Sequence, residues 1–207
     1  MRFRFYTIFI TSLCVIFSCF SQDVELVDIR EIIPGIILDI RYATPNNFTG
    51  RPLYTSADCF LARDVAIALK NVQEDLKRQG YQLKIFDGYR PLSVQKEMWK
   101  VFPNPKYIAN PLSGSIHNRG YAVDLTIVLL DGSPVLMPTD FDEFSVKAHS
   151  DYKNLPSPAI KHREILKKAM VKYSFMPIKT EWWHFTYPGY KDKPVLDIPF
   201  EKLKERD

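Results

Sequence analysis

The run Tyr121–Leu130 constrains the fold of this chain more than any other stretch. It is rich in β-branched, aliphatic and aromatic residues, and it ends at the turn pair Asp131-Gly132. Such a run favours a β-strand, and an Asp-Gly pair after it indicates a hairpin. We therefore expect the chain to be organised around a sheet that contains this strand.

Other segments follow either a strand or a helix period. Alternating or β-rich residues predict further strands at 24–29, 36–42, 81–86 and 181–187. Apolar residues at spacings of four and three predict a helix over 61–76, with Asp58 or an early neighbour as its cap and Gly80 as its stop. Further helices are predicted from Pro91 to Trp99 and from Ile160 to Tyr173.

Loops should connect these elements at 44–52, 102–114 and 134–158, and the charged tail after Phe200 should be solvated. A loop as long as the third is usually functional or disordered. Hairpin strands mixed with separate helices predict an α+β fold, with a small, mainly antiparallel sheet flanked by helices. At 207 residues and 46% hydrophobic, one domain is enough to bury a core.

Residues 1–21 do not fit that domain. The basic start Met1–Arg4 is followed by the apolar run Phe5–Phe20, and charged sequence begins soon after Ser21. This is the layout of a secretory signal peptide rather than a membrane-spanning helix, because the apolar run is short. We therefore expect residues 22–207 to form an exported domain, periplasmic or secreted, with no membrane span in the mature chain.

Two alternatives to simple cleavage remain open. The leader could stay attached as an anchor, or a lipid could be attached at Cys19, because Ile16–Cys19 partly resembles a bacterial lipobox. Only Cys59 lies outside the leader, so no disulfide can form within the domain. We interpret Cys59 as a buried structural thiol. Without Arg2 and Arg4 the net charge falls from +4 to +2, which argues against a nucleic acid partner.

Two segments hold the residues that suggest chemistry. His117 and Asp124 are seven apart with Gly120 between them, and Glu181 and His184 are three apart among aromatic residues. A catalytic zinc ion usually has three protein ligands and an open position for water. Two histidines and Asp124 would supply those ligands and leave Glu181 as a base. An ideal strand sends residues three apart to opposite faces, so a bend is required near Glu181.

From spacing alone, a zinc site and simply packed histidines are about equally acceptable. His149 and His162 are interpreted as packed, hydrogen-bonded residues. The zinc-binding helix motif HExxH is absent, and no nucleophile elbow, P-loop or dinucleotide-binding glycine pattern offers a competing site.

The pattern Ser115-x-His117-x-x-Gly120-x-Ala122-x-Asp124, followed by Glu181-x-Trp183-His184, resembles the zinc D-alanyl-D-alanine peptidases. It is most similar to the D-Ala-D-Ala dipeptidase branch, of the VanX type. The resemblance also takes in residues 39–44, 46–50, 87–91 and 137–142, in the same order, and so covers nearly the whole chain after the leader.

The resemblance implies a role for each of seven residues. His117, Asp124 and His184 would hold one zinc ion per chain, and Glu181 would be the general base toward the zinc-bound water. Arg90 would stabilise the oxyanion, and Ser115 and Asp142 would hold the charged ends of the substrate. The reaction implied is hydrolysis of the dipeptide D-Ala-D-Ala to two D-alanines, outside the membrane.

Two rival functions remain. A zinc carboxypeptidase or endopeptidase acting on longer peptidoglycan peptides would use the same metal site, but a dipeptidase needs a small closed cavity, for which 42–52 and 134–158 would supply walls. A non-catalytic wall-binding protein with a structural zinc would need neither Glu181 nor Arg90.

Overall fold

The computed structural model describes residues 24–205. The predicted signal peptide and the possible lipid site at Cys19 lie outside these residues. Within 24–205, no helix is both long enough and apolar enough to cross a bilayer.

A five-stranded sheet runs through the molecule in the order β2-β4-β5-β7-β6. Only the pair β2–β4 is parallel, and the other three pairs are antiparallel. The strands are β2 (Ile37–Leu38), β4 (Tyr81–Asp87), β5 (Ala122–Leu129), β6 (Met176–Pro177) and β7 (His184–Thr186). A separate antiparallel pair joins β1 (Leu26–Asp28) to β3 (Phe60–Ala62).

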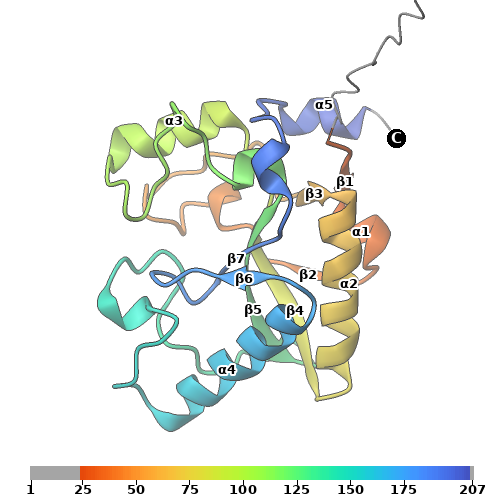
Figure 1. The fold of residues 1–207 in the computed structure, drawn as a ribbon, viewed down its shortest axis with the longest axis vertical. Helices are drawn as coiled ribbons and strands as arrows, with labels where there is room; N and C mark the ends of the chain where they lie inside the picture. Colours follow the sequence, from red (N-terminus) through yellow and green to blue (C-terminus); the bar gives the residue numbers. More distant parts are fainter. Residues whose placement is uncertain (1–23, 206–207) are drawn as a thin grey trace, which may run out of the picture.

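Helices surround the sheet, with α2 and α4 alongside it, α3 near one end and α5 beside the C-terminus (Figure 1). They are α1 (Ile29–Ile32), α2 (Arg63–Lys77), α3 (Leu92–Val101), α4 (Ser157–Lys172) and α5 (Phe200–Lys204). Short 3-10 helices are η1 (Arg41–Ala43), η2 (His117–Arg119), η3 (Val146–Ala148) and η4 (Tyr190–Asp192). The chain is an α+β domain with a mainly antiparallel sheet, as predicted.

The two faces of β4 and β5 differ in chemistry. Leu83 pairs with Ile127 and Ile85 with Leu125, and all four are fully buried on one face. Gln73 of α2 accepts the backbone N–H of Leu83, which places α2 on that side. Burying such side chains stabilises the fold by about 1.5–3 kcal/mol each. The opposite face carries polar residues, and the site lies there.

Four details differ from the sequence predictions. The hairpin after β5 is reduced to a single bridge from Val128 to Pro134, because proline cannot donate to a ladder. The β-rich run at 36–42 forms only the two residues of β2 before η1 begins. Asp58 does not cap α2, because the helix begins only at Arg63, and it forms ion pairs with Arg30 and Lys204 instead. The N-cap of α2 is Ala62.

The fourth difference is the tail. The prediction of a solvated segment after Phe200 holds for Glu201, Lys202, Lys204 and Glu205, which are exposed, but α5 buries Leu203 together with Phe200 before it. The ring of Phe200 lies 4.8 Å from that of Tyr54 and 5.3 Å from that of Phe60, between centroids. The sequence prediction overlooked that Phe200 and Leu203, set among lysines and glutamates, are three residues apart and so lie on one side of a helical turn.

A C-terminal strap, residues 193–198, crosses the loop that leads into β5. The N–H of Leu196 donates to the carbonyl of Asn118 at 2.8 Å, and the carbonyl of Leu196 accepts from the N–H of Leu92 at 3.1 Å. Arg119 donates to the carbonyl of Lys193. The strap therefore ties the segment around η2 to the start of α3 (Figure 1).

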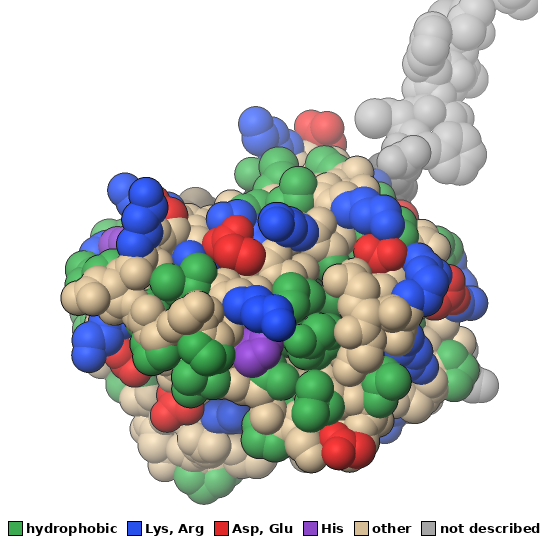
Figure 2. Space-filling view, turned by 90° about the horizontal axis from the view of Figure 1, so that it is seen from below, with side chains coloured by type: hydrophobic (Ala, Val, Ile, Leu, Met, Phe, Trp, Pro, Cys, Tyr) green, Lys and Arg blue, Asp and Glu red, His purple; other side chains and the backbone are tan. Residues whose placement is uncertain are grey.

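Figure 2 shows one outer face of the molecule. Basic and acidic side chains are interspersed on it, with hydrophobic side chains between them, so this face carries no extended field of one charge.

Candidate active site

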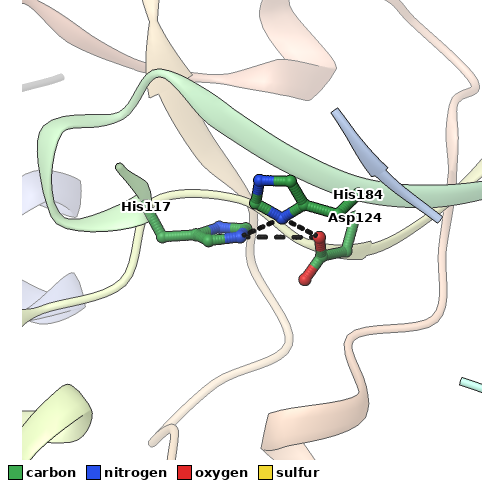
Figure 3. A group of neighbouring side chains, drawn as sticks. All are labelled: His117, Asp124 and His184. Atoms are coloured by element: carbon green, nitrogen blue, oxygen red, sulfur yellow. Dashed lines mark hydrogen bonds and ion pairs between the residues drawn. The ribbon is translucent and has the colours of Figure 1, made fainter. Parts of the chain in front are cut away.

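Three predicted ligands meet on the polar face of the sheet. His117 comes from η2, while Asp124 of β5 and His184 of β7 are direct cross-strand partners. Asp124 Oδ1 lies 2.9 Å from His184 Nδ1 and 3.5 Å from His117 Nε2, and the two ring nitrogens are 3.2 Å apart (Figure 3). All three residues are buried.

Gly120 makes the turn that brings His117 back over β5. Its φ of 73° lies in the left-handed region that favours glycine. A Cβ there would also lie 2.6 Å from Leu26 Cδ2 and 3.1 Å from the backbone nitrogen of Ala62. The glycine seen in the sequence therefore serves both the turn and a close backbone approach.

The hydrogen bonds of the two rings leave their facing nitrogens suited to a cation. His117 Nδ1 lies 2.7 Å from the carbonyl of Gly88. A carbonyl only accepts, so Nδ1 carries the proton and Nε2 of the neutral ring presents a lone pair to the cluster. His184 Nε2 lies 3.3 Å from the Thr186 hydroxyl, which can accept its proton and leave Nδ1 as the second lone pair.

The spacing of the three atoms also fits zinc. Tetrahedral ligands at about 2.0–2.1 Å from zinc are about 3.3–3.4 Å from one another, close to the distances of 2.9, 3.2 and 3.5 Å seen here. Burial raises the pKa of Asp124, but the imidazoles of His117 and His184 lower it further, so the net shift is down. Burial also lowers the pKa of His184. The set therefore presents an ionised carboxylate and a neutral imidazole, as a metal requires.

Glu181 lies before β7 rather than within it. The residues between it and His184 form a turn, which supplies the bend that the spacing of three demands. Its carboxyl is buried, and burial, with Asp124 and Asp142 nearby, raises its pKa well above the ordinary value, although Arg90 opposes the shift. The raised pKa favours the protonated form of this carboxyl more than in an exposed glutamate.

Arg90 is fixed by two buried neighbours that sequence reasoning missed. Asp87 Oδ2 accepts from Arg90 Nη2 at 2.6 Å and from Nε at 3.1 Å, and Gln95 Oε1 accepts from Nη1 at 2.8 Å. The guanidinium carbon also lies 5.1 Å from the centroid of the Tyr42 ring. Asp87 stands in the Asp-Gly-Tyr-Arg-Pro segment and could have been found there. Gln95 follows on α3, where nothing in the sequence marks it.

Ser115 and Asp142 lie on opposite loops. Ser115 Oγ accepts the backbone N–H of His117 at 3.3 Å, so the residue does shape the turn. Asp142 has a φ of 62°, and it accepts from the Tyr42 hydroxyl at 3.0 Å and from the N–H of Phe48 at 3.2 Å. Burial raises the pKa of Asp142 to about 7.

One cavity of about 250 Å³ brings all of these residues together. Its lining includes each of the seven predicted site residues: Arg90, Ser115, His117, Asp124, Asp142, Glu181 and His184. Apolar walls come from the loops 102–114 and 134–158, through Tyr107 and Phe144. Their rings stack with centroids 4.8 Å apart, which closes the cavity on that side.

Three residues set aside from the sequence lie elsewhere. Cys59 is a buried free thiol whose pKa is raised by burial. His162 Nδ1 lies 2.9 Å from the carbonyl of Leu136, and neither His162 nor His149 lines the cavity.

Fold and site together define a class: a one-domain α+β protein with a buried His-Asp-His set and a second carboxyl in one small cavity. A family model described as D-ala-D-ala dipeptidase matches residues 22–202. The chain belongs to this D-Ala-D-Ala dipeptidase family.

Curated relatives are similar in sequence to this chain over most of their length. A D-alanyl-D-alanine dipeptidase of Escherichia coli strain K12 is 35% identical over 180 residues, which is 87% of this chain and 93% of that protein. Another of the same name, from Enterococcus faecalis strain ATCC 700802 / V583, is 33% identical over 82% of this chain and 93% of its own.

Solved structures give a more distant likeness. A structure of VanYB in complex with D-alanine-D-alanine has a TM-score of 0.42 at 16% identity, covering 67% of this chain and 77% of its own. The LD-carboxypeptidase LdcB has a TM-score of 0.45 at 20% identity, covering 89% of this chain and 80% of its own.

Proposed function

We propose that this chain is a zinc metallopeptidase that hydrolyses the dipeptide D-Ala-D-Ala to two D-alanines. One observation carries the proposal: the ligand set, the buried carboxyl of Glu181 and the fixed guanidinium of Arg90 line the same small cavity. The relatives named as D-alanyl-D-alanine dipeptidases support the choice of substrate.

His117, Asp124 and His184 would hold one zinc ion per chain. Zinc there supplies Lewis acidity, which lowers the pKa of water and polarises a carbonyl. Glu181 accepts a proton from the attacking water and later donates it to the leaving amine. A carboxyl whose pKa is raised by burial is suited to both steps, since it can hold the proton and release it.

Arg90 stabilises the negative charge that develops on the carbonyl oxygen. Of its five N–H donors, three are engaged by Asp87 and Gln95, which leaves two for the oxyanion. Because its partners already fix the guanidinium, little reorganisation accompanies the reaction, and such donors are worth about 2.7–4 kcal/mol.

Asp142 and Ser115 hold the charged ends of the dipeptide in this proposal. The Asp142 carboxylate accepts the substrate ammonium, while Tyr42 and Phe48 orient it. The Ser115 hydroxyl accepts from His117, which leaves its own proton to donate to the substrate carboxylate.

The decisive experiment compares Glu181→Gln with wild type in an assay for free D-alanine from D-Ala-D-Ala. We expect the variant to lose about 10²–10⁴-fold in kcat, because the amide cannot accept the proton. Its zinc content should stay at the wild-type level, because Glu181 is outside the ligand set. Equally slow release by both proteins would sink the proposal. Glu164→Gln, on the partly exposed side of α4, is the matched control and should be fully active.

Substrate length separates this function from its nearest rival. A small cavity walled by loops favours a dipeptide over longer peptidoglycan peptides. A panel from D-Ala-D-Ala to a pentapeptide should show kcat/KM falling steeply with length. A wall-binding protein with a structural zinc is disfavoured because it would need neither Glu181 nor Arg90.

We further propose that residues 1–21 direct export and that 22–207 act in the periplasm or outside the cell. Cell fractionation tests the compartment. Mass spectrometry of the mature N-terminus distinguishes cleavage after Ser21 from lipid attachment at Cys19.

A further inference from the structure

A second cavity, of about 390 Å³, lies beside the active site on the same face of the sheet. Its floor includes Lys84 of β4 and Thr126 of β5, which are cross-strand partners. Asp124, the metal-ligand candidate, is two residues before Thr126 on the same strand, so its side chain points to the same face. The strand β5 therefore runs under both cavities.

Phe141 forms the wall between the two cavities. Its ring centroid lies 4.9 Å from that of Phe86, which lines the second cavity. The same ring lies 5.4 Å from Trp183 and 5.7 Å from Tyr42, which both line the first. One aromatic side chain thus packs against both compartments.

Two pairs of adjacent residues straddle this wall. Phe141 and Trp182 line the second cavity, whereas their chain neighbours Asp142 and Glu181 line the active site. The indole N–H of Trp182 donates to the Thr139 hydroxyl at 2.9 Å, and Thr139 also lines the second cavity. Anything bound there would rest on side chains that are covalently next to the proposed base and to a proposed substrate contact.

The charges of the second cavity favour a carboxylate. Arg41 and Lys84 share one partner, Asp39: Arg41 Nε lies 3.1 Å from Oδ1 and Lys84 Nζ lies 4.0 Å from Oδ2. Arg41 and Lys84 therefore place two cationic groups around one carboxylate, while the second carboxylate of the lining, Asp140, is exposed at the rim. Arg41 Nε is buried and, despite that ion pair, makes no hydrogen bond of good geometry.

The two Nη groups of Arg41 are oriented by packing and can donate to a ligand. The guanidinium carbon lies 4.8 Å from the centroid of the Phe86 ring, which fixes the plane. Neither Nη group donates a hydrogen bond to any residue of 24–205, and a guanidinium edge matches the two oxygens of a carboxylate. Asp140, exposed at the rim, offers an acceptor for an ammonium group.

We propose that this second cavity binds a small amino acid. Its carboxylate contacts Arg41 and Lys84, its side chain packs on Phe86 and Trp182, and its ammonium group faces Asp140. Occupancy alters turnover through Phe141 and Trp182. If the proposed function holds, the product D-alanine belongs to this ligand class.

The binding test uses D-alanine as the probe and the indole N–H resonance of Trp182 as the readout, assigned with Trp182→Phe. We expect a saturable shift with D-alanine and none with D-alaninamide, which lacks the carboxylate. Lys84→Gln and Arg41→Gln should each weaken binding about tenfold, the loss typical of one charged hydrogen-bonded contact. Lys77→Gln, which removes a lysine charge from α2, should bind as wild type.

The absence of a saturable shift in wild type overturns the proposal. An equal shift in wild type, Lys84→Gln and Arg41→Gln also overturns it, because the binding would then lie in the first cavity. If Arg41→Gln does not fold, Lys84→Gln decides, since its side chain is partly exposed and its removal leaves no buried charge. Binding is measured without substrate, so a failure of the proposed peptidase reaction leaves this result standing.

The coupling is tested by kinetics. D-alanine should lower kcat in wild type, and this effect should be lost in Lys84→Gln while turnover without added D-alanine is unchanged. Purely competitive inhibition that persists in Lys84→Gln would contradict a regulatory role.

Discussion

Asp87 binds Arg90 through one oxygen, Oδ2, which accepts hydrogen bonds from Nη2 at 2.6 Å and from Nε at 3.1 Å. The same Oδ2 lies 3.7 Å from Nδ1 of His117, and Oδ1 accepts from the Tyr54 hydroxyl at 2.6 Å. One fully buried carboxylate therefore links the proposed oxyanion donor to a proposed metal ligand.

Removing that carboxylate should be costly. We expect Asp87→Ala to lower the free energy of unfolding by about 3–5 kcal/mol, because Arg90 would be left as an uncompensated buried charge. Glu97→Ala, which breaks exposed pairs with Arg51 and Lys100, should lower this free energy far less, because surface ion pairs contribute little. Urea unfolding of both variants measures the difference, and equal losses would show that the buried pair is not special.

The metal-ligand assignment is tested by zinc content. His117→Ala should lose stoichiometric zinc after dialysis, because only two ligands remain. His162→Ala, which alters a histidine outside the cavity, should keep one zinc per chain. Retention of zinc by His117→Ala would place the metal elsewhere.

Gly88 offers a subtler test of the same site. A Cβ at this position would lie 2.6 Å from Cys59 Sγ and 2.8 Å from the carbonyl oxygen of Phe60. Gly88→Ala should therefore shift the carbonyl that orients His117, and we expect zinc affinity to fall about 10–100-fold. Chelator competition measures the affinity. Gly80→Ala, at a position with φ of 85° but open space, should cost stability without changing zinc affinity.

Asp142 predicts a pH-dependent stability. Its folded pKa, about 7, lies above the ordinary value of 3.8 because of burial. Below the pKa of the unfolded state, a raised carboxyl pKa does not change the free energy of unfolding. As pH rises from there through the pKa of the folded state, the free energy of unfolding falls. Wild type should therefore lose stability relative to Asp142→Asn between about pH 4 and pH 7, by up to about 4 kcal/mol. Asparagine tolerates the left-handed backbone at this residue. Unfolding at fixed zinc content across this pH range checks the sign, and a constant difference would refute it.

The sequence predicted best where one periodic pattern decided the structure. The apolar period of α2 and the alternation of β4 were sufficient, because each element buries a single continuous face. Sequence patterns did not predict the structure where it depends on contacts or backbone chemistry outside the pattern. Pro134 follows a good turn pair, but it has no N–H with which to extend a ladder with β5 beyond one bridge. Phe200 is buried because its ring packs against those of Tyr54 and Phe60, which are distant in the sequence.

The site divides in the same way. The structure brings all seven predicted residues to one cavity, although their roles stay predictions. Asp87, Gln95 and Tyr42 support them through contacts that no local spacing encodes. The bend at Glu181 was a conflict between strand geometry and the proposed chemistry, and it is resolved by β7 beginning only at His184.

The C-terminal strap has a consequence for how this molecule comes into being. His184 and residues 193–198 are synthesised after α2, β4 and β5, yet the strap fixes the loop that carries His117. A nascent chain can form α2, β4 and β5 but cannot complete a metal centre. Maturation of the site therefore awaits synthesis of the strap, so a chain truncated before Lys193 should have its sheet but load zinc poorly.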